Sequence, residues 1–88
     1  MTTRVAVLGA GSWGTALASV LSGKGYDVVL WSRGAEVADA VNELHENRTY
    51  LPGVPLPVEL RASTDLHEAL EDAELVVAVV PSLAMRDT

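Results

Sequence analysis

The sequence predicts an α/β protein built on a parallel, doubly wound sheet. Short apolar runs alternate with segments of helical periodicity in the order β-α-β-α-β-α-β, with short connections. The first apolar run leads directly into Gly9, Gly11 and Gly14, which have the spacing G-x-G-x-x-G. Because crossover connections are right-handed, we expect the strand order 3-2-1-4, with a ligand at the carboxyl ends of strands one and four.

The glycine-rich turn joins a predicted strand over Arg4–Leu8 to a predicted helix over Ser12–Leu21. Gly9 permits a tight turn, Gly11 lets the backbone approach a pyrophosphate, and Gly14 lets the helix pack close to the strand. The unpaired N–H groups and the dipole at the helix start stabilise an anion without a basic side chain. This context favours a Rossmann-type dinucleotide turn over a tight connection that binds nothing.

The first helix is followed by a glycine turn and a second strand. The helix is expected to bury one apolar face, formed by Ala16, Leu17, Val20 and Leu21. Gly23 and Gly25 end the helix, and the apolar run Asp27–Trp31 predicts a buried strand.

A second helix is predicted over Ala35–His45, and a proline-rich connection follows it. The expected apolar positions of this helix are Val37, Ala38, Val41 and Leu44. The connection over residues 46–57 contains Pro52, Pro55 and Pro57, which exclude a regular helix. Residues Val58–Ala62 then predict a short third strand.

The last predicted elements are a helix over about Asp65–Leu70, capped by Thr64 or Asp65, and a strand over Leu75–Val80. This strand is apolar on both faces, which is typical of an interior strand, yet it would lie at the edge of the sheet. Either the chain is a fragment of a longer protein, or it forms a homodimer through this edge. We favour the fragment, because such a sheet usually continues with further strands.

Composition and charge exclude several classes of protein. The formal net charge of −6 argues against a nucleic acid or an anionic membrane surface as partner. The chain has no cysteine, which excludes disulfides, thiolate zinc sites and a cysteine nucleophile. The longest apolar run is too short to span a membrane. We expect a soluble, cytoplasmic protein that forms part of one domain over residues 1–88 and binds no metal.

The end of the second predicted strand indicates which dinucleotide binds. Sites for NAD place an acidic residue there to hold the ribose hydroxyls, whereas this chain has Trp31, Ser32 and Arg33. Arg33 can bond a 2′-phosphate bidentately and Ser32 can donate another hydrogen bond, which favours NADP over NAD. The missing acid also disfavours an S-adenosylmethionine methyltransferase. The alternative is that Arg33 is an ordinary solvated residue.

Four segments together resemble the N-terminal part of bacterial NAD(P)-dependent glycerol-3-phosphate dehydrogenases. They are GAGSWGTALA (9–18), LWSR (30–33), NELHENRTYLPGVPLP (42–57) and VVPS (79–82). The resemblance spans nearly the whole chain and implies hydride transfer between NAD(P)H and dihydroxyacetone phosphate, giving sn-glycerol 3-phosphate for phospholipid synthesis. The alternatives are a stand-alone nucleotide-binding or regulatory module and a dehydrogenase of 2-hydroxy or 3-hydroxy acids, which the YLPG segment disfavours.

The resemblance also implies roles for single residues. Ser12 and Trp13 would contact the cofactor at the glycine turn, Arg33 would meet its adenosine end, and Tyr50 would line its site. Read without the resemblance, Trp13 packs over the helix start and Tyr50 anchors a loop. Ser82, just after the fourth strand, either supports the nicotinamide or only ends the strand.

No residue of this chain is expected to be catalytic. Ketone reduction needs a cationic or proton-donating group at the developing alkoxide, and the resemblance gives this role to lysines that would lie beyond Thr88. The single lysine, Lys24, follows the first helix, at the far end from the glycine turn. His45 is expected at a helix end and His67 on a solvated face. We expect the chain to bind cofactor without turning over substrate.

Overall fold

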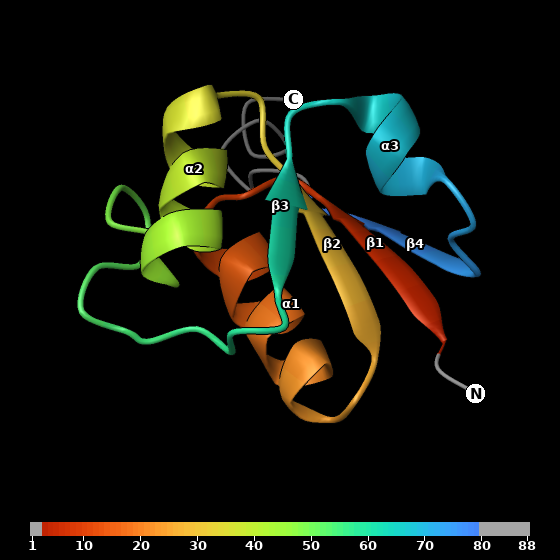
Figure 1. Cartoon of the computed structure of the whole chain (residues 1–88), viewed down its shortest axis with the longest axis horizontal. Helices are drawn as coiled ribbons and strands as arrows, with labels where there is room; N and C mark the ends of the chain where they lie inside the picture. The colour runs from red at the N-terminus through yellow and green to blue at the C-terminus, as the bar shows by residue number, and fades with distance from the viewer. Residues whose placement is uncertain (1–2, 80–88) are drawn as a thin grey trace, which may run out of the picture.

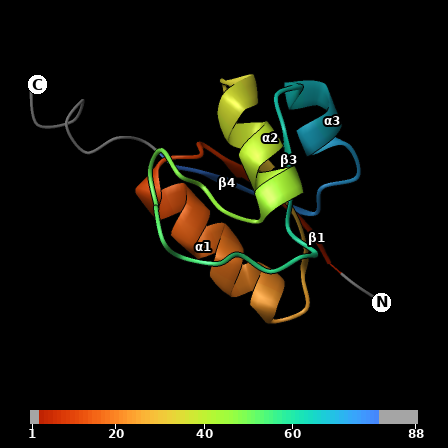
Figure 2. The same ribbon diagram turned by 60° about the vertical axis from the view of Figure 1, so that its left-hand side comes forward.

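The computed structural model describes residues 3–79 and places four parallel strands in one sheet (Figure 1). The elements in chain order are β1 (Arg4–Leu8), α1 (Ser12–Gly23), β2 (Asp27–Trp31), α2 (Ala35–Leu44), β3 (Arg61–Ser63), α3 (Leu66–Leu70) and β4 (Leu75–Ala78). The strand order is β3-β2-β1-β4, which confirms the predicted topology. Helices α1 and α2 lie on one face of the sheet and α3 lies on the other (Figure 2).

The centre of the sheet is formed by β1 and β2, which pair in parallel from Arg4 with Asp27 to Leu8 with Trp31. Their middle residues are buried, and they are Val5, Ala6, Val7, Val28, Val29 and Leu30. Both faces of these strands are therefore covered, as is usual in a parallel sheet with helices on either side. The two strands end side by side, next to the first residues of α1.

Helix α1 packs on the sheet mainly through small residues, and the predicted apolar face of this helix is confirmed only in part, at Leu21, which packs against the core. Its buried residues are Gly14, Thr15, Ala18 and Ser22, whereas Val20 is 54% exposed. Gly14, Ala18 and Ser22 are spaced four apart and lie on one side of the helix. Small side chains on that side let the helix backbone approach the strands closely, which a row of leucine and valine would prevent.

Helix α2 ends at Leu44, one residue earlier than predicted. His45 follows with a left-handed φ of 54° and so stops the helix. Val37, Ala38 and Val41 are buried as predicted, but the side chain of Leu44 is 51% exposed. The carbonyl oxygen of His45 accepts a 2.8 Å hydrogen bond from the amide of Leu56, which brings together the two ends of the proline-rich loop.

Strand β3 begins later than the sequence predicts. Val58 was expected to start this strand, but it is 68% exposed and lies in a turn. The amide of Leu60 donates a 3.1 Å hydrogen bond to the carbonyl of Pro57, which holds this turn. The proline fixes the turn conformation, so the chain becomes extended only at Arg61.

Strand β4 lies at the edge of the described sheet and pairs with β1, from Leu75 opposite Val5 to Ala78 opposite Leu8. Its apolar side chains are partly uncovered, since Leu75 is 52% and Val76 is 46% exposed. The predicted last residue of this strand, Val80, lies outside the described residues.

Candidate functional site

A cleft opens at the carboxyl ends of the central strands, where α1 and α2 begin. Its volume is about 990 Å³, at the upper end of the roughly 300–1,000 Å³ that is typical of cofactor sites. Every residue that the sequence analysis assigned to the cofactor lines this cleft, namely Gly9, Gly11, Ser12, Trp13, Gly14, Ser32, Arg33 and Tyr50. Segments that are far apart in the sequence therefore meet at one site.

The three glycines of the turn differ in what surrounds them. Gly9 has a left-handed φ of +118°, and a Cβ added there would lie 2.9 Å from the carbonyl oxygen of Val79. A Cβ added at Gly14 would collide with the carbonyl oxygen of Gly9. A Cβ added at Gly11 would meet no atom within 4 Å. The protein's own packing therefore requires Gly9 and Gly14, whereas Gly11 leaves its backbone open to a ligand.

The start of α1 supplies hydrogen-bond donors and a positive potential to the cleft. The N-cap residue of this helix is Gly11, which makes no side-chain capping bond, and the first turn has no acidic residue. The first N–H groups of a helix have no partner within the helix, and the helix dipole places partial positive charge on them. These features suit a phosphate group better than a neutral or cationic one.

The end of β2 forms the other side of the cleft. Ser32 is 4% exposed, and its hydroxyl donates a 3.1 Å hydrogen bond to the carbonyl of Gly34 while it accepts one of 3.2 Å from the amide of that residue. The hydroxyl proton of Ser32 is thus engaged within the turn before α2. Arg33 is exposed and has no hydrogen-bond or ion-pair partner among residues 3–79, so its guanidinium is available to an anion.

Two aromatic residues of the cleft present much of their surface to solvent. Trp13 is 80% exposed and Tyr50 is 50% exposed. Little of Trp13 is therefore covered by the helix start, contrary to the packing alternative. The loop that carries Tyr50 passes beside the start of α1 (Figure 2), where the hydroxyl of Ser12 donates a 2.6 Å hydrogen bond to the Tyr50 carbonyl.

Asn47 and Glu36 are residues of this region that the sequence analysis missed. Glu36 lies in the first turn of α2, three residues after Arg33 in the chain, and lines the same cleft. Asn47 is fully buried behind the wall of the cleft, with its side chain bonded to the glycine turn and to the Tyr50 amide. The only sign of Asn47 in the sequence is its place in the HENRTY segment, because burial of a loop residue depends on distant contacts.

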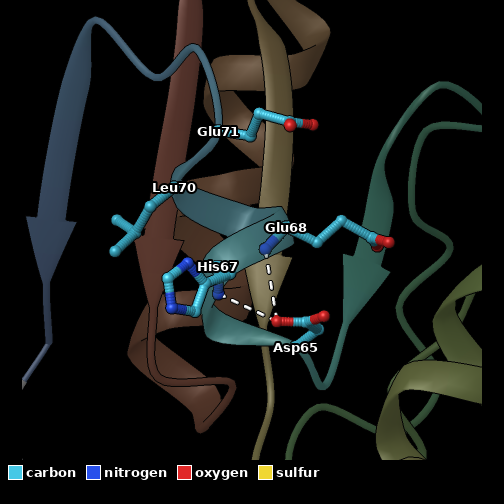
Figure 3. A pocket seen from close by; sticks show the side chains of 5 residues that line it. All are labelled: Asp65, His67, Glu68, Leu70 and Glu71. Atoms are coloured by element: carbon cyan, nitrogen blue, oxygen red, sulfur yellow. Dashed lines mark hydrogen bonds between the residues drawn. The ribbon is translucent and has the colours of Figure 1, made fainter.

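A second hollow, of about 510 Å³, lies beside α3 and is lined by Asp65, His67, Glu68, Leu70 and Glu71 (Figure 3). Asp65 is the N-cap of this helix, as one predicted alternative has it. Its carboxylate accepts hydrogen bonds of 2.9 and 3.3 Å from the amides of His67 and Glu68. All the lining residues are exposed. The hollow is thus a solvent-exposed surface around the N-cap of α3. His67 lies on a solvated face, as expected.

The side chains most often used for proton transfer to a ketone, histidine and lysine, do not line the described part of the cleft. Lys24 is the C-cap of α1, at the opposite end of the helix from the glycine turn, and no histidine or lysine of residues 3–79 lines the cleft. No group of acidic, histidine or cysteine residues suited to a metal occurs in that range. None of the helices described there is long and apolar enough to cross a membrane. Ser82 lies outside the described residues.

Known proteins are similar to this chain in sequence and in fold. The family described as NAD-dependent glycerol-3-phosphate dehydrogenase N-terminus matches residues 4–88. The NAD(P)+ glycerol-3-phosphate dehydrogenase of Stenotrophomonas maltophilia is 55% identical over 85 residues, which are 97% of this chain and 25% of that protein. The crystal structure of glycerol-3-phosphate dehydrogenase from Coxiella burnetii has a TM-score of 0.83 and 44% identity, over 98% of this chain and 26% of that one. The chain thus spans about a quarter of the length of these relatives.

Proposed function

We infer the function of this chain from its family, because it belongs to the NAD-dependent glycerol-3-phosphate dehydrogenases and matches their N-terminal part. We propose that its cleft binds the nicotinamide dinucleotide with which such an enzyme interconverts dihydroxyacetone phosphate and sn-glycerol 3-phosphate. The observation that carries this proposal is the meeting of the glycine turn, the start of α1 and the end of β2 in one cleft.

The pyrophosphate of the dinucleotide would lie at the start of α1. Gly11 presents open backbone there, and the helix start offers N–H donors with no acidic side chain in its first turn. Trp13 and Tyr50 line the same cleft and offer apolar surface to the cofactor. In this arrangement the chain orients the cofactor mainly through backbone donors and shape.

The adenosine end of the cofactor would lie near Arg33, and this residue supports a preference for NADPH over NADH. An exposed guanidinium without a partner in the described range can bond a 2′-phosphate bidentately. Ser32 could add a hydrogen bond only if its hydroxyl turned away from Gly34. Glu36 at the same end of the cleft would repel a phosphate, so it sets a limit to this preference.

The chain supplies binding and orientation rather than proton transfer. The bound dinucleotide provides the hydride, but the developing alkoxide of the substrate needs a cationic or acidic partner. Because Lys24 lies at the far end of α1 and no lysine or histidine of residues 3–79 lines the cleft, we propose that this partner is not supplied by the described residues. The resemblance to bacterial enzymes of phospholipid synthesis supports a cytoplasmic location as part of the same proposal.

Calorimetric titration of the purified chain with NADPH, and separately with NADH, tests the proposal. We expect saturable binding of both, with NADPH bound more tightly. Adding dihydroxyacetone phosphate to the chain with NADPH should leave the NADPH absorbance unchanged, because the alkoxide has no partner. A folded chain that binds neither dinucleotide would refute the proposed function. Oxidation of NADPH by this chain, on addition of dihydroxyacetone phosphate, would refute the proposal that its cleft supplies binding without a proton donor.

A further inference from the structure

We propose that Asn47 is a positioning residue for the dinucleotide, which it serves by fixing Tyr50 against the glycine turn. Its side chain is fully buried and does not itself line the cleft, so it acts through the residues that it holds. The inference rests on the proposed function, because it assigns a second layer of residues to the same dinucleotide site. The evidence is a set of hydrogen bonds made by the two polar atoms of the buried Asn47 side chain, Nδ2 and Oδ1.

On one side, the amide of Asn47 holds the cofactor turn. Nδ2 donates to the carbonyl oxygen of Ala10 at 2.9 Å and to Oγ1 of Thr15 at 2.8 Å. Ala10 is the residue between the first two glycines of the turn, and Thr15 follows the third. The hydroxyl of Thr15 in turn donates to the Ala10 carbonyl at 3.3 Å, so the three groups form a closed network. Both protons of the amide are therefore used.

On the other side, Asn47 holds the backbone of Tyr50. Its Oδ1 accepts a 3.1 Å hydrogen bond from the Tyr50 amide, and its own carbonyl accepts one of 2.8 Å from the amide of Leu51. The Tyr50 carbonyl is held by the hydroxyl of Ser12 at 2.6 Å. Tyr50 is thus fixed at both its N–H and its C=O groups, by two side chains, although its ring remains half exposed to the cleft.

The chemistry of the amide is specific to this position. An aspartate has the same shape, but its carboxylate has no proton to donate and would face the carbonyl oxygen of Ala10 in a buried place. A leucine would fill the volume and leave the Tyr50 amide without its acceptor. Asn47 is 0% exposed, so water could not readily replace the lost bonds.

The chain offers a control in Asn42, which has the same side chain but is exposed where Asn47 is fully buried. Like that of Asn47, its side chain both donates and accepts: it donates to the Ala62 carbonyl at 2.9 Å and accepts from the Ala62 amide at 2.8 Å. These bonds join α2 to β3, and Asn42 does not line the cleft. Loss of this amide should lower stability without moving any residue of the cofactor turn. Comparing Asn42→Asp with Asn47→Asp therefore separates a loss of folding stability from a loss of cofactor affinity caused by misplaced cleft residues.

The experiment measures NADPH affinity by calorimetry and stability by urea unfolding for Asn47→Asp and Asn42→Asp. We expect both variants to unfold at lower urea concentration. We expect a loss of NADPH affinity of about tenfold or more for Asn47→Asp, and of less than about twofold for Asn42→Asp, since one hydrogen bond in a network is worth about 1.4 kcal/mol or a factor of ten. Equal affinities for folded Asn47→Asp and the wild-type chain would overturn the inference.

A double-mutant cycle tests whether Asn47 acts through Tyr50. If it does, Asn47→Asp should cost less affinity in a Tyr50→Ala chain than in the wild-type chain. Equal costs in both backgrounds would contradict action through Tyr50. A wild-type chain that is folded but binds no dinucleotide would instead refute the proposed function, which distinguishes the two failures.

Amide hydrogen exchange gives a test whose first measurement, on the wild-type chain, does not depend on the folding of any variant. The Tyr50 amide is bonded to the buried Oδ1 of Asn47, so we expect it to exchange at least tenfold more slowly than the amide of the neighbouring exposed Thr49. Thr15→Val removes one hydrogen-bond partner of the Asn47 side chain, so the Tyr50 backbone amide should exchange faster in this variant. Rapid exchange at Tyr50 in the folded wild-type chain would overturn the inference.

Discussion

The hydroxyl of Ser12 lies 2.6 Å from the carbonyl oxygen of Tyr50 and joins the first residue of α1 to a loop 38 residues further along the chain. Ser12 was expected to contact the cofactor directly. In this arrangement its hydroxyl proton is engaged by the protein, while its backbone N–H stays at the helix start. Ser12 thus has two separable roles in the cleft. Its side chain holds the loop that carries Tyr50, and its backbone N–H contributes to the start of the helix.

Ser12→Ala should therefore weaken NADPH binding modestly. One hydrogen bond is worth about 0.5–1.5 kcal/mol, so we expect a loss of roughly twofold to tenfold in calorimetric affinity. Ser19→Ala makes the same change two turns further along α1, outside the cleft, and should leave the affinity unchanged. Identical affinities for the two variants would argue against a role of the Ser12 hydroxyl in placing the loop.

Gly14→Ala and Gly11→Ala should have opposite effects on folding and binding. The new Cβ of Gly14→Ala collides with the Gly9 carbonyl, so we expect the free energy of unfolding to fall by about 2–3 kcal/mol in urea titrations. Gly11→Ala meets no protein atom and should change it by less than about 1 kcal/mol. Its methyl group would, however, stand where the pyrophosphate approaches, so its NADPH affinity should fall. A Gly11→Ala chain with full affinity would contradict the placement of the pyrophosphate.

Arg33→Ala should weaken NADPH much more than NADH. Charge-assisted hydrogen bonds are worth about 1.5–3 kcal/mol, which predicts a roughly tenfold to hundredfold loss for NADPH and little change for NADH. Glu36→Gln serves as the opposite case, because removing a negative charge at the same end of the cleft should strengthen NADPH binding alone. Parallel losses for both dinucleotides in Arg33→Ala would refute the 2′-phosphate role.

Asp65→Ala should affect stability and not binding. The carboxylate caps α3 through the amides of His67 and Glu68, and loss of such a cap costs about 1 kcal/mol of folding free energy. Urea unfolding should show this loss, while calorimetry with NADPH should show an unchanged affinity. A large drop in affinity would mean that the hollow beside α3 takes part in binding.

Several features of this protein follow from short stretches of sequence, because local chemistry decides them. The glycine turn is one, since the positive φ of Gly9 and the close approach at Gly14 leave no room for other residues. The cap at Asp65 is another, because its side chain bonds amides only two and three residues ahead. The strand order follows from the alternation of strands and helices, since right-handed crossovers exclude most other topologies.

Other features were decided only by the tertiary structure. Periodicity placed leucine and valine on the inner face of α1, but close packing on β1 and β2 selects Gly14, Ala18 and Ser22 for that face. The apolar Val58 suggested a strand, but the turn after Pro57 leaves it exposed. Asn47 reads as an ordinary loop residue, and its three side-chain bonds depend on Ala10, Thr15 and Tyr50 meeting in space. Hydrogen bonds between residues close in the chain can be predicted from the sequence. The partners of a buried side chain such as that of Asn47 are set only when distant segments pack together.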